Sequence, residues 1–354
     1  MTRARNEIVD PNVTPYYHCI SRCVRRAFLC GFDKFTRKNF DHRKAWVVER
    51  LALLSHTFAM DVFAYAVMSN HMHCLVRMNT QQANTWSEAE VTHRWNKIYA
   101  VPYLVEEYHK GNCNAAQARQ AQRTIETWRE RLGSLSWFMR CLNEHIARLA
   151  NQEDECTGRF WEGRFKSQAL LDEGAVLTCM SYIDLNPIRA KITDKLETSD
   201  FTSIQQRLKE TTPKKVQRQG VRKKMPEAKQ SIKNSKKAPV LVKLMPLLPL
   251  HKDTHPNALG IVSKDYFELV DWAGRCMRHG KRGKIDDDIP PILERLELDP
   301  YEFILRLSER HQKPLIEHPI ALGAIHCLKA FAKKLGAKFI RGQSVVASLY
   351  RVSA

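Results

Sequence analysis

Two histidines, His71 and His73, flank one hydrophobic residue inside the apolar segment 61–76. The Val, Phe and Tyr content of this segment, with a break near residues 69–70, predicts two β-strands. Side chains at positions i and i+2 of a strand point to the same face, so this spacing places two imidazoles side by side. Neutral imidazole is a common ligand of divalent metals. The alternative is a pair of half-exposed strand histidines, because one His-x-His arises by chance in about half of chains with this histidine content.

Tyr182 and Asn186 form a second candidate pair, in a segment that we expect to be helical from Asp172 to about Leu185. Asp172 suits the cap of such a helix, and Pro187 would stop it. Residues at i and i+4 share a helix face, so a phenol and an amide oxygen would project together. An amide oxygen suits Mg²⁺ or Mn²⁺, and a phenol is a nucleophile once deprotonated. The alternative is a buried helix tyrosine followed by an ordinary Asn-Pro helix terminator.

The elements that must position these residues follow from periodicity. A strand over 16–24, a helix over 42–58 and the two strands of segment 61–76 give the order β-α-β-β, the front of a ferredoxin-like split βαβ unit. We therefore expect an α+β fold with an antiparallel sheet and helices on its faces. Further helices are predicted over 86–108, 117–132 and 136–150, and a strand rich in aromatics and cations is predicted over 158–171.

The charge of the chain points to a polyanionic partner. The 57 Lys and Arg residues exceed the 38 Asp and Glu residues by 19, and nucleic acid is the obvious candidate for such an excess. Segment 207–237 is strongly basic and has almost no aromatic or branched apolar residues, so we expect a disordered basic linker there. The chain beyond about residue 263 has helical periodicity and predicts a small all-α C-terminal domain.

Other function classes are disfavoured by missing patterns. None of the ten cysteines forms a Cys-x-x-Cys pair, which argues against a zinc ribbon or finger. We find no secretory signal, no apolar run of about 18 residues and no P-loop. The expectation is a cytoplasmic protein with reduced thiols, no membrane span and no nucleotide cofactor.

Four segments, 25–31, 64–73, 161–167 and 182–190, occur in an order that closely resembles the single-tyrosine HUH transposases. Within them, the chain is most similar to the bacterial REP-associated tyrosine transposase branch, over residues of about 14 to 200. The resemblance implies a ferredoxin-like HUH nuclease core over 1–205 with a helical insertion of about 85–150. A basic linker over 206–250 and a helical domain over 251–354 would follow. It also implies a bacterial, nucleoid-associated protein.

The resemblance also assigns roles at matching positions. His71 and His73 would hold one divalent metal, Mg²⁺ or Mn²⁺, and Tyr182 would be the nucleophile. Asn186 would be the third metal ligand, a position where some relatives carry Gln.

Seven cations are expected to contact DNA phosphates, although each could instead be a solvated surface charge. They are Arg22, Arg25, Arg26, Arg159, Arg164, Lys166 and Arg189. Between them, Trp161 and Phe165 could stack on single-stranded bases. The favoured alternative is that both rings belong to the core and that the neighbouring cations still face DNA.

The expected function is a metal-dependent single-stranded DNA endonuclease and strand transferase. It would cleave at or near hairpin or palindromic repeats through a 5′-phosphotyrosine, as a monomer or a homodimer. Three alternatives stay open. They are a rolling-circle replication initiator or relaxase of the HUH type, a domesticated repeat-DNA-binding protein that does not cut, and a metal-dependent hydrolase.

Overall fold

A five-stranded sheet lies at the centre of the computed structural model, which describes residues 8–24, 29–33, 37–211, 240–247, 260–278, 290–308, 320–340, 343 and 348–350. The strands are β1 (Tyr16–Arg22), β2 (Met60–Val67), β3 (His71–Met78), β4 (Lys166–Leu170) and β5 (Ala321–Leu322), in the order β2-β3-β1-β4-β5. β1 runs antiparallel to β3 and β4, β2 antiparallel to β3, and β5 parallel to β4. The predicted α+β class and the initial β-α-β-β order are confirmed.

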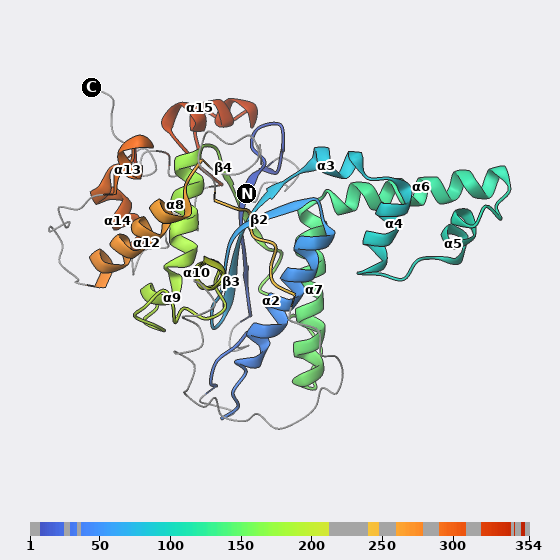
Figure 1. Ribbon diagram of the computed structural model, residues 1–354, viewed down its shortest axis with the longest axis horizontal. Helices are drawn as coiled ribbons and strands as arrows, with labels where there is room; N and C mark the ends of the chain where they lie inside the picture. The colour runs from blue at the N-terminus through green and yellow to red at the C-terminus, as the bar shows by residue number, and fades with distance from the viewer. Residues whose placement is uncertain are drawn as a thin grey trace.

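Helices cover both faces of the sheet (Figure 1). The helices α2 (His42–Thr57) and α7 (Leu135–Glu153) pack together on one face, where Asn143 Nδ2 of α7 donates to Ser21 Oγ of β1 at 2.9 Å. The helix α8 (Glu173–Asp184) lies on the opposite face, and all its residues from Gly174 to Asp184 are buried. A helix that is largely apolar on every side is stable only when other elements surround it. The sheet is therefore the middle layer of the core.

The ends of α8 follow the sequence prediction. Asp172 is its N-cap, and Asp172 Oδ1 accepts from the backbone N–H of Ala175 at 2.8 Å. The helix ends at Asp184 and is followed by the one-turn helix α9 (Asn186–Arg189), which has Pro187 in its first turn. Proline is favoured in a first turn, where its missing N–H would have no helical partner. This junction keeps Tyr182 and Asn186 close in space.

Between β3 and α7, an insertion extends away from the sheet (Figure 1). It comprises α3 (Thr80–Thr85), α4 (Glu88–Asn96), α5 (Tyr103–His109) and α6 (Ala115–Leu132). The single helix predicted over 86–108 is wrong, because Pro102 lies between α4 and α5 and disfavours helix in the residue before it. The helices predicted over 117–132 and 136–150 are confirmed as α6 and α7.

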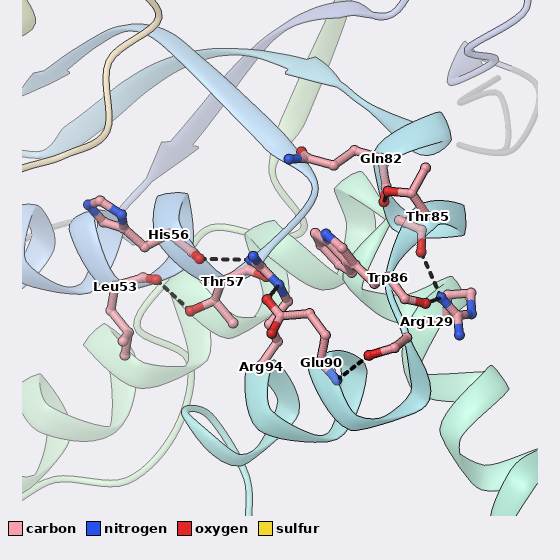
Figure 2. Close-up of polar contacts among 11 residues, drawn as sticks. Leu53, His56, Thr57, Gln82, Thr85, Trp86, Glu90, Arg94 and Arg129 are labelled. Atoms are coloured by element: carbon pink, nitrogen blue, oxygen red, sulfur yellow. Dashed lines mark hydrogen bonds and ion pairs between the residues drawn. The ribbon is translucent and has the colours of Figure 1, made fainter.

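Arg94 joins the insertion to the core and Arg129 joins two helices within the insertion, as Figure 2 shows. Arg94 of α4 donates to the carbonyls of His56 and Thr57, at 2.9 and 3.1 Å, at the end of α2. Arg129 of α6 donates to the carbonyls of Ala83 and Trp86. The last carbonyls of a helix lack partners within it, so a cation there satisfies them and interacts favourably with the helix dipole.

The strand predicted over 158–171 is shorter than expected, and the described ends of the segment predicted as a linker, 206–250, are packed against the core. Only 166–170 is a strand, and an isolated bridge joins Trp161 to Cys23. Residues 206–211 continue α10 (Ser203–Thr211), where the buried Arg207 donates to the carbonyl of Phe63. Residues 240–247 pack beside β2, since the N–H of Met245 donates to the carbonyl of Val62 at 2.8 Å. Residues 212–239 lie outside the described residues.

The described residues of the C-terminal part form helices and one short strand. Its helices are α12 (Ser263–Arg278), α13 (Pro291–Arg295), α14 (Pro300–Ser308) and α15 (Ile325–Lys334). The prediction of an all-α unit was incomplete, because β5 extends the central sheet. A strand of two residues is too short to produce a period-2 pattern in the sequence. In the described part of the chain, no helix is both long and apolar enough to cross a membrane.

The buried carboxyl of Asp184 joins three helices. It accepts from Ser203 Oγ at 2.5 Å, from the N–H of Ile204 at 3.0 Å and from Tyr266 Oη of α12 at 2.6 Å. Burial raises the pKa of Asp184 to about 6, against the opposing effect of the hydrogen bonds from Ser203 and Tyr266. The end of α8 is therefore held by an acid that titrates near neutral pH.

The stability of the fold should depend on the titration of Asp184. The pKa of an unfolded Asp is about 3.9, so the folded chain binds this proton more tightly. The resulting stabilisation is present at low pH and is lost as pH rises through about 6, with a loss of about 1.4 kcal/mol between pH 5 and pH 7.5. Asp184→Asn should remove this component from urea unfolding curves, whereas the exposed-site control Asp271→Asn should retain it. An unchanged pH dependence in Asp184→Asn would contradict the assignment.

Candidate active site

The register of the sheet places four of the candidate residues on one face. Arg22 of β1 pairs with His71 of β3, and Ile20 pairs with both His73 of β3 and Lys166 of β4. Side chains directly opposite each other project to the same face, as do those two positions apart on one strand. Arg22, His71, His73 and Lys166 therefore share a face, so two predicted DNA contacts flank the histidine pair.

The helix α8 brings Tyr182 to this face. The ring centroid of Tyr182 lies 5.6 Å from that of His73, and the centroids of His71 and His73 are 4.8 Å apart. The side chains of Tyr182 and Asn186 are each 1% exposed. The structure thus brings together the predicted nucleophile, its helix neighbour and the histidine pair.

Arg189 contacts both the phenol and the amide. One of its terminal nitrogens donates to Tyr182 Oη at 2.7 Å and to Asn186 Oδ1 at 2.9 Å. Its guanidinium carbon lies 4.4 Å from the centroid of the Tyr182 ring. A planar guanidinium can stack on an aromatic ring while its N–H groups donate elsewhere. The predicted phosphate contact Arg189 is therefore engaged with the two other candidate side chains of its own segment.

Each histidine of the pair has one nitrogen engaged and one nitrogen without a hydrogen-bond partner among the described residues. His71 Nδ1 lies 2.6 Å from Asn70 Oδ1, and His73 Nδ1 lies 2.9 Å from Nε2 of the buried His18. Among the described residues, the Nε2 atoms of His71 and His73 are buried and make no hydrogen bond. The sequence pattern did not single out His18. It lies four residues before Arg22 on β1, and this even spacing places both side chains on the same face of the sheet.

Both imidazoles of the pair are neutral at neutral pH. The pKa of His71 is lowered to about 3, mainly by burial and in part by the nearby positive charges of Arg22 and Arg189. Burial also holds the pKa of His73 well below its usual range, with contributions from the other ionisable groups of the site. Each histidine can therefore offer a lone pair without first releasing a proton.

The donor atoms fit a divalent metal in part. Two neutral imidazoles with buried, unpartnered Nε2 atoms on one sheet face are a suitable donor pair. Asn186 Oδ1, the predicted third donor, accepts a hydrogen bond from Arg189. Within the described ranges, no group of three or more His, Cys, Asp or Glu side chains is arranged to hold a metal.

The other predicted DNA contacts are exposed or lie outside the described residues. Arg159, Arg164 and Lys166 are exposed, whereas the side chains of Trp161 and Phe165 are buried. Trp161 Nε1 donates to the carbonyl of Asn143 at 2.9 Å. The aromatics thus belong to the core, as the favoured alternative predicted. Arg25 and Arg26 lie outside the described residues.

Comparison with known proteins gives one structural similarity. The sequence matches no protein family and no curated protein. Among solved structures, the chain is similar to a REP-associated tyrosine transposase bound to a REP hairpin. The two chains are 11% identical, with a TM-score of 0.32, and the match covers 55% of this chain and 78% of that chain. The similarity is distant.

Proposed function

We propose that this chain is a metal-dependent single-stranded DNA endonuclease and strand transferase that acts at or near hairpin or palindromic repeats. One observation carries the proposal. The ring of Tyr182, on a buried helix, lies 5.6 Å from that of His73, whose Nε2, like that of His71, is buried and has no partner among the described residues. A phenol nucleophile beside a donor pair for a divalent cation suits phosphodiester transfer.

Tyr182 supplies the nucleophile. Its phenol oxygen would attack the scissile phosphorus while the phenol proton leaves to solvent. The bond from phosphorus to the 3′-oxygen breaks, the 3′-oxygen takes up a proton, and the 5′-phosphate stays on the tyrosine. One phosphodiester replaces another, so a DNA 3′-OH can later displace Tyr182 and rejoin a strand without ATP. Arg189 donates to the phenol oxygen and thereby stabilises negative charge that develops there.

His71 and His73 would hold the metal through their Nε2 atoms. When bound, a divalent cation such as Mg²⁺ or Mn²⁺ would act as a Lewis acid that polarises the scissile phosphate. Asn186 Oδ1 accepts from Arg189 at 2.9 Å, and an amide oxygen has a second lone pair that could be given to the metal.

Cations around the pair would bind the DNA backbone. Arg22 and Lys166 share the face of the histidines, and Arg159 and Arg164 are exposed on the segment that leads into β4. Phosphate contacts of this kind set affinity and position but carry no base information. The preference for a hairpin is therefore assigned to shape and base contacts elsewhere on residues of about 14 to 200.

A second candidate function is repeat-DNA binding without cleavage. It is favoured by the side-chain exposure of Tyr182, which is 1%, and by the stacking of Arg189 over its ring. Cleavage requires DNA to reach the phenol past this guanidinium, whereas binding alone does not. A covalent protein–DNA adduct separates the two functions.

Tyr182→Phe should abolish the adduct and leave the fold intact, because it removes a single oxygen. The assay is incubation with labelled single-stranded hairpin DNA and Mg²⁺ or Mn²⁺, followed by a denaturing gel. Tyr103→Phe is the matched control, because the Tyr103 side chain is 73% exposed on the insertion, and it should form the adduct normally. An adduct in Tyr182→Phe would assign another nucleophile, and none in the unaltered protein would favour binding without cleavage.

His71→Ala and His73→Ala should each lower cleavage by more than about 100-fold, as expected for the loss of a metal ligand. EDTA should have the same effect on the unaltered protein. Hairpin affinity in a gel-shift assay should change little, since cations supply most of the binding. The exposed His93 on α4 provides the control, and His93→Ala should cleave normally. Cleavage that persists in EDTA would refute the metal-dependent mechanism.

The combined substitution of Arg164→Ala and Lys166→Ala should weaken binding to cognate and scrambled hairpins equally. Each lost phosphate contact should reduce the slope of log affinity against log salt by about 0.7 on single strands. The control is Arg148→Ala, because Arg148 is 79% exposed on α7 and this helix covers the opposite face of the sheet. A selective loss of cognate binding would show instead that these cations read sequence.

A further inference from the structure

His18 is a buried histidine on the face of the sheet that carries the pair. It lies on β1 opposite Leu75, two positions from Ile20, which pairs with His73. Its side chain is 0% exposed. Its Nε2 lies 2.9 Å from His73 Nδ1, and the two rings are nearly parallel, with an interplanar angle of 16°. The contact with His73 matters for stability, because a buried imidazole without hydrogen bonds is energetically costly.

The position of one proton follows from the direction of the lone pairs. A neutral imidazole has one N–H and one lone pair. If Nε2 of His73 offers its lone pair to a cation, the proton of His73 is on Nδ1. His73 Nδ1–H then donates to His18 Nε2, which accepts. His71 has the equivalent arrangement, because its Nδ1 lies 2.6 Å from the amide oxygen of Asn70.

We infer that His18 is a positioning residue, which fixes the tautomer and ring orientation of His73 by accepting its Nδ1–H. The inference rests on the proposed function, because it concerns how the same site is prepared for its metal. His18 need not touch the metal or the DNA to act in this way. Histidines that ligate metals almost always donate their second N–H to a carboxylate, a carbonyl or water, and the loss of such a partner typically costs 10–100-fold in affinity. Here a third imidazole would take that place.

Two substitutions separate a hydrogen-bond acceptor from a space-filling side chain. His18→Leu fills much of the same volume with apolar atoms and removes the acceptor. His18→Gln retains an amide oxygen that can accept from His73 Nδ1–H. If His18 only fills space, the leucine variant should be at least as good as the glutamine variant, because burial of an apolar side chain needs no partner.

The first measurement is titration of the protein with Mn²⁺ alone, by calorimetry or by electron paramagnetic resonance. His18→Leu should weaken Mn²⁺ binding by about 10–100-fold, whereas His18→Gln should stay within about threefold of the unaltered protein. His145→Gln is the control, since His145 is half-buried on α7 and this helix covers the opposite face of the sheet. Far-UV circular dichroism and the thermal midpoint report whether each variant folds.

The second measurement needs no metal. Long-range ¹H–¹⁵N NMR of ¹⁵N-histidine protein distinguishes Nδ1–H from Nε2–H tautomers, and His73→Ala identifies the signal of His73. We expect the Nδ1–H tautomer of His73 in the unaltered protein and in His18→Gln, and a mixture in His18→Leu. A purely structural role of His18 would leave the tautomer unchanged.

The outcomes distinguish this inference from the proposed function. If the unaltered protein binds no Mn²⁺ and cleaves in EDTA, the proposed metal-dependent function fails. If it binds Mn²⁺ and His18→Leu matches it in affinity and tautomer, the role of His18 is overturned and the function stands. If His18→Leu does not fold, His18→Gln decides. Retained affinity and tautomer support the inference, and loss of either overturns it.

Discussion

The antiparallel pairing of β1 with β3 is the constraint on which the candidate site depends. It sets Arg22 opposite His71 and Ile20 opposite His73, and β1 also pairs with β4 on its other side. A slip of one residue would turn every side chain of a strand to the opposite face of the sheet. The histidines would then face α2 and α7 instead of Tyr182. Both faces of the sheet are covered, so such a slip would also bury the wrong side chains, and the register is strongly specified.

The second requirement is the placement of α8, which depends on hydrogen bonds from residues far away in the sequence. At its start, the two carboxylate oxygens of Asp172 accept from Tyr350 Oη at 2.7 Å and from the N–H of Ala324 at 2.6 Å. At its end, Asp184 accepts from Tyr266 at 2.6 Å. Both ends of the helix that carries Tyr182 are therefore held by residues of the C-terminal part. The position of the phenol depends on packing across the whole chain rather than on the local segment alone.

The same cations serve two purposes in this arrangement. The charges of Arg22 and Arg189 help keep His71 neutral, which leaves its lone pair available for a cation. They also create a positive potential beside the histidine pair, and such a potential attracts phosphate. Arg189 also donates hydrogen bonds to the phenol of Tyr182 and to the amide oxygen of Asn186, and so holds these two side chains together. A single cation, Arg189, thus organises the side chains of Tyr182 and Asn186 beside the histidine pair.

Local periodicity and capping residues were enough to predict several features before the structure was known. These are the first four elements, the shared face of His71 and His73, and the start of α8 at Asp172. Tertiary structure alone decided the contact between His18 and His73, the hydrogen bonds of Arg189, and the pairing of β5 with β4. The physical reason is that periodicity reports which way a side chain faces but not what lies opposite it. That partner is set by strand register and by the packing of helices far apart in the sequence, and both are properties of the assembled core.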